Sequence, residues 1–258
     1  MKKDADAFGE MLLHGLAGED VAEIVERDDG FIAVGIFGPR GYFAPRRAWP
    51  GVERRAMRYV RGHVLDVGCG GGRFCLEAQA RGLHVVGIDI SLGAVEACRR
   101  RGVRDVRLLG IDDVDESLGR FDTIVMFGNN FGLFGRPAKA KRLLRRFVGL
   151  TTEQGRIVAT GRHVYATGDP AHLAYHRRNR ERGRFAGELR MRVRFRDLAG
   201  PWFDYLIVSK EEMAELVRGT GWRIRRVLED QGPFYCAILE KELSTSSTSQ
   251  SRTGSIPR

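Results

Sequence analysis

The chain of 258 residues is 43% hydrophobic and 29% charged, a composition typical of a soluble globular protein with a core of its own. It contains no apolar run near the roughly 18 residues that a membrane span needs, and its first residues lack the apolar stretch of a secretory signal. We therefore expect a cytoplasmic protein without a membrane partner. The four cysteines form no C-x-x-C pair, which favours reduced thiols over disulfides or a zinc site.

The net charge of +10 is distributed unevenly along the chain. Residues 162–200 hold ten arginines against four acidic residues, which gives this segment a net charge of +6. A basic segment of this kind favours an anionic partner or substrate. A solvated, charged surface is the alternative.

The first 50 residues are expected to form a mainly helical cap. Apolar residues at helical spacing predict one or two amphipathic helices over residues 5–27, followed by a short strand over 31–34. An aromatic and basic connector that contains Tyr42 and Trp49 then leads to a helix over about 51–61.

Strands and helices alternate through the middle of the chain. We expect strands at 63–67, 84–89, 106–109, 121–127 and 155–160, and helices at about 72–81, 91–101 and 137–150. Ser91 is placed to cap the second of these helices. Alternation at this spacing predicts an α/β protein with a doubly wound sheet.

The alternation stops between Arg162 and Ser209. Here we expect a polar helix at about 170–182, a strand over 187–196 in which arginines alternate with apolar residues, and a partner strand within 201–208. A helix at 210–219 and strands at 222–228 and 235–239 follow. The predicted division is an N-terminal cap (1–50), a core (51–161), an inserted substrate lid (162–209), the end of the core (210–243) and a low-complexity, disordered tail (244–258).

The first strand of the core ends in a glycine-dense turn, Asp66-Val-Gly68-Cys69-Gly70-Gly-Gly72-Arg73. Glycines remove the Cβ atoms that would keep a ligand from the backbone, and the helix that begins after the turn directs its N–H groups at that ligand. A dinucleotide site needs G-x-G-x-x-G, but Arg73 stands in place of the third glycine. Asp66 would also repel a pyrophosphate, whereas it suits an amino group.

The pattern Asp66-x-Gly68-x-Gly70-x-Gly72 resembles motif I of the class I S-adenosylmethionine (SAM) methyltransferases, whose ligand carries an ammonium, a carboxylate and no phosphate. The resemblance implies a Rossmann-like, seven-stranded sheet with an antiparallel seventh strand, a cap over the cofactor and a lid inserted after the fifth strand. It places Cys69 and Arg73 of the turn, and Tyr42 and Trp49 of the cap, among the cofactor-binding residues; for Tyr42 and Trp49, simple packing is the alternative.

Three acids near the ends of the next strands are expected to bind the cofactor. Asp89 ends the strand at 84–89, close to the offset of about 20 residues from the glycine turn at which an acid receives ribose hydroxyls, and Ile90 beside it is assigned to the same site. Capping of the next helix is the alternative for Asp89. Asp112 resembles the acid that binds the adenine amine in this superfamily; Asp113 is not separated from it by sequence, and a plain loop acid is the alternative.

Asn129 and Asn130 follow the strand at 121–127, at the sheet edge where ligands bind in open α/β folds. Their place resembles motif IV, but the sequence is not the Asn-Pro-Pro-Tyr of amino-methylating DNA enzymes. We expect these amides to orient the methionyl part of SAM or a substrate amine, and a turn role stays open for Asn130. Together with Tyr-His-Arg-Arg-Asn-Arg and Trp-Phe-Asp-Tyr, the segment looks like a group of bacterial methyltransferases of unknown substrate.

The lid contributes the candidates for a general base that activates an amine or hydroxyl nucleophile. They are His163, His172, His176 and Tyr175. The alternative is a surface or packing role for each, and no acid completes a metal site with the two helical histidines. We therefore predict a SAM-dependent methyltransferase that acts on N or O of a small, anionic or amine-bearing molecule. The alternatives are an RNA methyltransferase that uses the arginine-rich lid and a non-catalytic SAM-binding regulator.

Overall fold

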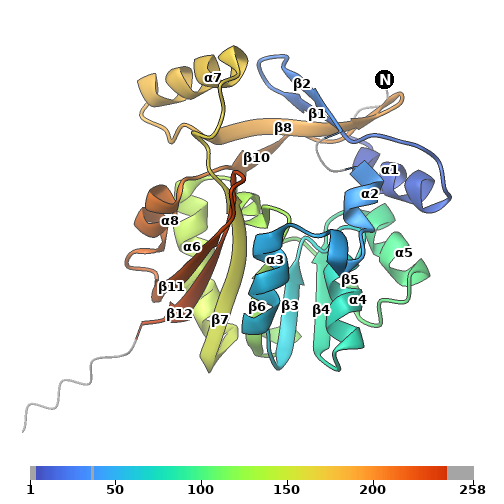
Figure 1. The fold of residues 1–258 in the computed structure, drawn as a ribbon, viewed down its shortest axis with the longest axis vertical. Coiled ribbons are helices and arrows are strands. Elements are labelled where there is room, and N and C mark those ends of the chain that lie inside the picture. The colour runs from blue at the N-terminus through green and yellow to red at the C-terminus, as the bar shows by residue number, and fades with distance from the viewer. Residues whose placement is uncertain (1–3, 36–37, 243–258) are drawn as a thin grey trace, which may run out of the picture.

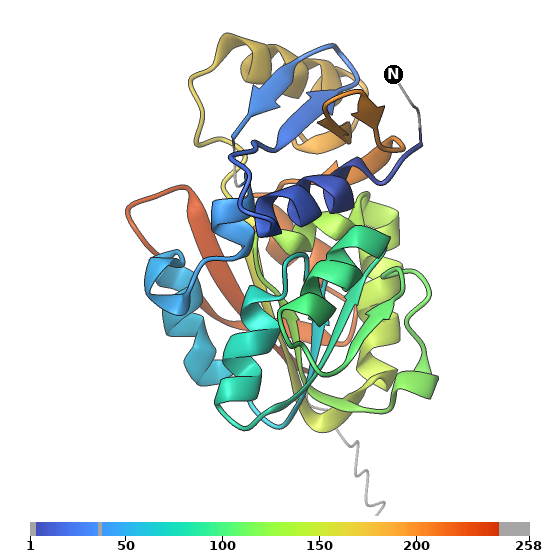
Figure 2. The ribbon, with the colours of Figure 1, turned by 90° about the vertical axis from the view of Figure 1, so that its right-hand side faces the viewer.

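The protein contains two sheets, and the smaller one lies above one end of the larger one (Figures 1 and 2). The computed structural model describes residues 4–35 and 38–242, so the predicted tail at 244–258 lies outside the described residues. In this part of the chain the larger sheet, sheet B, has seven strands in the order β11-β12-β7-β6-β3-β4-β5, and the smaller, sheet A, has five, with β10-β8-β1-β2 in line and β9 paired to β8. None of the described helices is long and apolar enough to cross a membrane.

Sheet B confirms the predicted Rossmann-like core. Its strands are β3 (His63–Val67), β4 (His84–Asp89), β5 (Val106–Leu108), β6 (Phe121–Met126), β7 (Thr151–Arg162), β11 (Trp222–Glu229) and β12 (Phe234–Lys241). The first five are mutually parallel, and β12 runs antiparallel to both β7 and β11. The seven-stranded sheet with an antiparallel last strand is therefore the one that the sequence predicted.

Helices cover both faces of sheet B, as strands that are apolar on both sides require. Apolar side chains of α6 (Pro137–Gly149) and α8 (Lys210–Val217) pack on one face, and those of α3 (Gly51–Ala56), α4 (Arg73–Ala80) and α5 (Leu92–Arg100) on the other. Short 3₁₀ turns lie among the connections between these elements: η1 (Arg46–Ala48), η2 (Met57–Tyr59), η3 (Glu116–Leu118) and η4 (Asn130–Phe134). The helix expected at 51–61 thus ends earlier and continues as η2.

The N-terminal cap is only partly helical, which corrects the prediction of helices over residues 5–27. Helix α1 (Ala7–Leu16) stops before Gly18, whose φ of +93° ends the helical path. Residues Ile24–Arg27 form β1 instead, and the predicted strand follows as β2 (Ile32–Val34). Branched side chains at Val21, Ile24 and Val25 fit a helical spacing, but their restricted χ1 angles favour a strand.

Sheet A joins strands of the predicted cap to strands of the predicted lid, two segments that were expected to be separate. Strand β1 pairs antiparallel with β2 on one side and with β8 (Glu188–Phe195) on the other, and β8 also pairs with β10 (Phe203–Leu206) and β9 (Leu198–Ala199). The lid helix α7 (Pro170–Glu181) lies beside this sheet, while α1 and α2 (Gly38–Tyr42) lie between the two layers (Figures 1 and 2). Sheet A therefore sits above the carboxyl ends of β3, β4 and β6.

Candidate functional site

The glycine turn after β3 has the backbone geometry that the motif requires. Gly68, Gly70 and Gly72 have φ angles of +72°, +53° and +74°, in the left-handed region that only glycine enters without strain. A Cβ on Gly70 would lie 3.1 Å from the ring of Tyr42, so the cap packs directly over the turn. The turn is thus held between α4 below and the Tyr42 ring above.

Asp89 connects the end of β4 to the glycine turn. Its carboxylate accepts hydrogen bonds from the backbone N–H of Gly70 at 2.9 Å and of Ser91 at 3.0 Å. Burial raises its pKa, and these two donors act in the opposite direction. The N-cap of α5 is Ser91, whose hydroxyl accepts from the Ala94 N–H, so Asp89 itself does not cap that helix.

Asp66 is a second buried carboxylate at the same turn. It is 3% exposed and accepts a hydrogen bond from the Cys75 thiol at 3.3 Å. Burial raises the pKa of Asp66 to about 7. Cys69 is also buried, with its Sγ 3.8 Å from that of Cys98. Two acids flanking a glycine turn can accept hydrogen bonds from the hydroxyls and the ammonium of SAM, and they would repel a pyrophosphate. These acceptors therefore fit SAM and not a dinucleotide.

Arg73 and Trp49 form a buried support beside the turn. The Arg73 guanidinium lies 2.7 Å from a carboxylate oxygen of Glu53 and 4.9 Å from the centre of the Trp49 ring. Glu53 also accepts the backbone N–H of Gly128. Trp49 is 2% exposed and donates its indole N–H to the Ala44 carbonyl. These contacts tie α3 to the loop after β6; nothing in the sequence pattern singled out Glu53.

The two asparagines after β6 have different environments. Asn130 donates from its side-chain amide to the carbonyls of Val67 and Gly68, both at 2.8 Å, and so ties the loop to the glycine turn. Asn129 has a φ of +68°, unusual for a side-chain-bearing residue, and its N–H donates to the Thr160 hydroxyl. Within residues 4–35 and 38–242 its side-chain amide has no hydrogen-bond partner, which leaves that amide available to a ligand.

The structure separates Asp112 from Asp113. Asp112 forms ion pairs with Lys139 and with Arg142, the latter at 3.0 Å, and these cations lower its pKa against the effect of burial. A Cβ placed on Gly110 would lie 2.9 Å from an Asp113 carboxylate oxygen and 3.3 Å from the Ile90 side chain. Asp113 therefore lies with Ile90 beside the end of β4, whereas Asp112 is held by α6.

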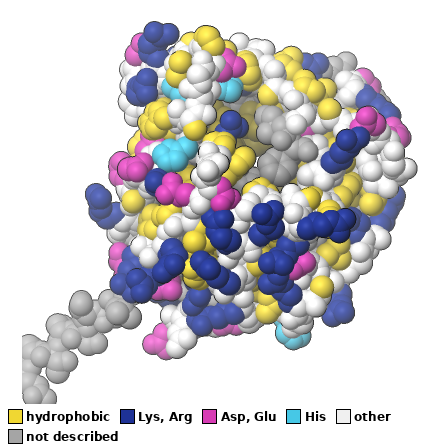
Figure 3. Space-filling view, viewed as in Figure 1, with side chains coloured by type: hydrophobic (Ala, Val, Ile, Leu, Met, Phe, Trp, Pro, Cys, Tyr) yellow, Lys and Arg dark blue, Asp and Glu magenta, His cyan; other side chains and the backbone are white. Residues whose placement is uncertain are grey.

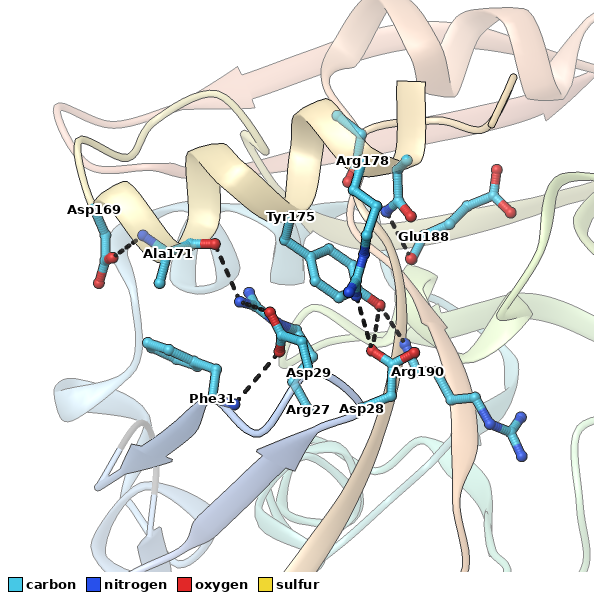
Figure 4. A network of polar contacts seen from close by, with 12 residues as sticks. Arg27, Asp28, Asp29, Phe31, Asp169, Ala171, Tyr175, Arg178, Glu188 and Arg190 are labelled. Atoms are coloured by element: carbon cyan, nitrogen blue, oxygen red, sulfur yellow. Dashed lines mark hydrogen bonds and ion pairs between the residues drawn. The ribbon is translucent and has the colours of Figure 1, made fainter. Parts of the chain in front are cut away.

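Tyr175 belongs to a polar network that fixes α7 to sheet A (Figure 4). Its hydroxyl donates to Asp28 at 2.8 Å, and its ring lies between the guanidinium groups of Arg27 and Arg178, at 4.2 and 4.6 Å. Arg27 is held in turn by both carboxylate oxygens of Asp29, at 2.7 and 2.8 Å. Burial raises the pKa of Tyr175, which opposes formation of a phenolate.

Two of the three histidines of the lid are neighbours on α7, and the third lies on another element. His172 and His176 lie one turn apart on α7, and burial lowers the pKa of both. The His172 ring hydrogen-bonds the Thr167 hydroxyl at 3.0 Å and packs edge-on against the Phe31 ring. His163 lies at the end of β7, 5.9 Å from the ring of Tyr235. The described residues contain no cluster of His, Cys, Asp or Glu that could hold a metal ion.

The arginines of β8 are paired with acids of the neighbouring strands. Arg192 and Arg194 lie 2.8 and 3.5 Å from Glu26 of β1, and Arg190 lies 3.3 Å from Asp204 of β10. The part of the predicted basic surface that lies on β8 is therefore balanced by acids within sheet A. On the face drawn in Figure 3, most lysines and arginines gather lower, over the layer of sheet B.

Two further side chains approach this region and were not predicted. Glu23, just before β1, is 7% exposed and accepts a hydrogen bond from the Tyr42 hydroxyl at 2.9 Å. Tyr205 of β10 donates its hydroxyl to the Asn129 carbonyl at 2.7 Å. Tyr205 stands in the Trp-Phe-Asp-Tyr segment that the sequence analysis noted, but Glu23 has no motif around it.

Comparison with known proteins identifies the fold. Residues 64–155 match the family model described as a methyltransferase domain. A solved SAM-dependent methyltransferase from Bacteroides fragilis, in complex with S-adenosyl-L-homocysteine, is 26% identical, with a TM-score of 0.78 over 92% of this chain and 95% of that chain. The chain therefore has the fold of a class I SAM-dependent methyltransferase.

Other solved methyltransferases share the fold of this methyltransferase at lower identity. The CcbJ methyltransferase from Streptomyces caelestis is 12% identical, with a TM-score of 0.57 over 78% of this chain and 98% of that one. A SAM-dependent methyltransferase from Methanosarcina mazei is 18% identical, with a TM-score of 0.56 over 72% and 96%. At these identities the likeness extends to the fold alone. These comparisons confirm the predicted fold class, and the Bacteroides structure together with the family model confirms the predicted cofactor, SAM.

Proposed function

We propose that this methyltransferase acts on a nitrogen or oxygen atom of a small molecule bound between sheet A and the carboxyl edge of sheet B. One observation carries the proposal: sheet A covers the loop after β6 that holds Asn129 and Asn130 (the motif IV loop), because Tyr205 of β10 donates its hydroxyl to the Asn129 carbonyl. Figure 3 shows the surface hollowed between the two layers. An acceptor held there meets the carboxyl edge at which α/β folds bind their ligands.

The acids and glycines of the site are proposed to hold SAM. Asp89 accepts the ribose hydroxyls, and Asp113 with Ile90 receives the adenine, because Asp112 is already paired with cations of α6. Asp66 and the glycines at 68, 70 and 72 are assigned to the methionyl end, together with the free amide of Asn129. Arg73, Cys69, Trp49 and Asn130 act indirectly in this scheme, by shaping the turn and its loop.

Bound SAM supplies a methyl group already activated by a sulfonium. The protein has to align the nucleophile with that group, and orientation of this kind is worth roughly 7–11 kcal/mol. Sheet A and α7 exclude water from the region where charge is neutralised. His172 and His176 are proposed as proton acceptors, since their lowered pKa keeps them neutral at neutral pH; His163 is retained as a third candidate, and Tyr175 is disfavoured by its bond to Asp28.

The test is transfer of a radiolabelled methyl group from SAM into a cell extract that is then separated into small molecules, RNA and protein. We expect the label in the small-molecule fraction. Label in RNA would replace the proposal by an RNA methyltransferase, whose binding should weaken steeply as salt is added. Absence of label with SAM still bound would support a regulatory SAM-binding protein.

A further inference from the structure

Glu23 brings a buried carboxylate into the space between the two sheets. It accepts the hydroxyl of Tyr42 at 2.9 Å, and the ring of that tyrosine lies against Gly70 of the glycine turn. The charge of Glu23 also contributes, after burial as the main cause, to the raised pKa of Tyr205. Glu23 is thus joined through Tyr42 to the glycine turn, and Tyr205 of sheet A is bonded to the loop that holds Asn129.

The two faces of sheet A carry different charges. Side chains alternate along a strand, so Glu26 of β1 faces away from Val25 and from the side on which Glu23 meets Tyr42. Glu26 pairs with Arg192 and Arg194, and these arginines occupy its face of the sheet. Strand β8 thus turns these two arginines away from the Glu23 side, and a ligand beside Tyr205 meets a carboxylate there.

We propose that the acceptor is an amine and that Glu23 binds its nitrogen, with Tyr42 and Tyr205 shaping the site around it. The proposal rests on the function proposed above and specifies its substrate class. A carboxylate is the group that holds an ammonium most strongly by a charge-assisted hydrogen bond. It repels an acceptor that presents a carboxylate or phenolate oxygen, which argues against the anionic substrate that the arginine count suggested.

The charge movement in the reaction favours the same assignment. The bound ammonium first loses one proton to solvent or to a histidine of α7, which frees the lone pair of the neutral amine. That lone pair then forms the C–N bond while the C–S bond breaks and its electron pair returns to sulfur. The positive charge passes from sulfur to nitrogen. Glu23 stabilises that charge where it develops, which is the most effective place for a fixed carboxylate.

The experiment uses the full-length protein, cell extract and SAM labelled with ¹³C in the methyl group, and reads the chemical shift of the methyl carbon in the purified small-molecule product. We expect an N-methyl signal. An O-methyl signal would overturn the amine assignment while leaving the proposed function intact. No labelled small molecule at all would overturn the proposed function, and this proposal with it.

The variant Glu23→Gln tests the residue itself. We expect the rate with limiting acceptor to fall at least about tenfold, as for loss of a charge-assisted hydrogen bond, while the affinity for S-adenosylhomocysteine measured by calorimetry stays within about twofold. Glu23→Asp should recover part of the rate. Glu26→Gln is the matched control: Glu26 lies in β1, three residues after Glu23, and faces the other side of sheet A. This variant should leave the rate within about twofold. An unchanged rate in Glu23→Gln, or an equal loss of S-adenosylhomocysteine affinity, would overturn the proposal.

Discussion

Gly93 at the start of α5 lies directly against Gly9 of α1: a Cβ built on Gly93 would be 2.6 Å from the Gly9 Cα. The Asp6 carboxylate crosses the same contact, accepting the Ser91 hydroxyl at 2.9 Å and the Gly93 N–H at 2.8 Å. The N-terminal helix is thus fastened to the residues that follow Asp89. Sheet A rests on this helix, so the contact couples the cap to the cofactor site.

Substitution of Gly93 by alanine should loosen the cap. The added methyl group has no room against the Gly9 backbone, and overpacking of this kind costs about 1–3 kcal/mol. We expect a lower melting temperature and weaker binding of S-adenosylhomocysteine, measured by thermal shift with and without the ligand. Gly232→Ala is the control, because a Cβ there meets nothing within 4 Å. A Gly93→Ala protein with wild-type stability would show that α1 does not dock as described.

Asp89→Ala should weaken SAM binding by at least about 1.5 kcal/mol, since charge-assisted hydrogen bonds are lost. Part of the loss comes from the turn, because Asp89 also holds the Gly70 N–H. Calorimetric titration with S-adenosylhomocysteine gives the measurement. Affinity equal to that of the wild type would mean that the ribose is bound elsewhere.

Asp113→Asn and Asp112→Asn separate the two neighbouring acids. If Asp113 accepts the adenine amine, its amide variant should bind S-adenosylhomocysteine about 3- to 10-fold more weakly, as one hydrogen bond is worth about 0.5–1.5 kcal/mol. Asp112→Asn removes only the ion pairs with α6 and should bind it as the wild type does. The reverse ranking would move the adenine to the α6 side of the loop.

The buried carboxyl of Asp66 should make both stability and cofactor affinity depend on pH. Its pKa of about 7 in the folded protein lies above the ordinary value of 3.8, so between about pH 4 and 7 the native state binds more protons than the unfolded state. The unliganded protein therefore loses stability as the pH rises through this window, by at most about 1.4 kcal/mol per pH unit from this group.

In Asp66→Asn, the free energy of unfolding should depend less steeply on pH, because the contribution of the Asp66 carboxyl is gone. Urea unfolding between pH 5 and 8 measures this dependence. Binding of an ammonium beside Asp66 favours its ionised form, so the affinity of the wild type for S-adenosylhomocysteine should rise from pH 6 to 8. The variant should show a weaker rise and a lower affinity at pH 8. Identical pH profiles for the two proteins would mean that Asp66 does not titrate in this range.

The sequence was informative where local pattern determines structure. Val64, Leu65 and Val67 run into glycines that only a tight turn accommodates, and this predicts the strand, the turn and the helix of the cofactor site. The pairing of β8 with β10 in sheet A was predicted, since the two strands are close in sequence. The pairing of β8 with β1 was missed because it joins distant segments, such as Ile24 with Arg194. The same distance in sequence explains why the arginines of the lid were interpreted as a basic surface. Glu26, which pairs with Arg192 and Arg194, lies far from them along the chain.

Tyr175 is the candidate base that its hydrogen bond to Asp28 disfavours. Its hydroxyl is bound to Asp28 and accepts weakly from the Arg190 N–H, so Tyr175→Phe should cost about 1 kcal/mol of stability and little else. We expect a small drop in melting temperature with kcat within about twofold of the wild type. His172→Asn is the companion variant and should lower kcat by about 100-fold if His172 accepts the proton, because general base catalysis typically contributes 10²–10⁴. A large loss of kcat in Tyr175→Phe with an unaltered melting temperature would indicate that Tyr175, and not His172, takes part in the proton transfer.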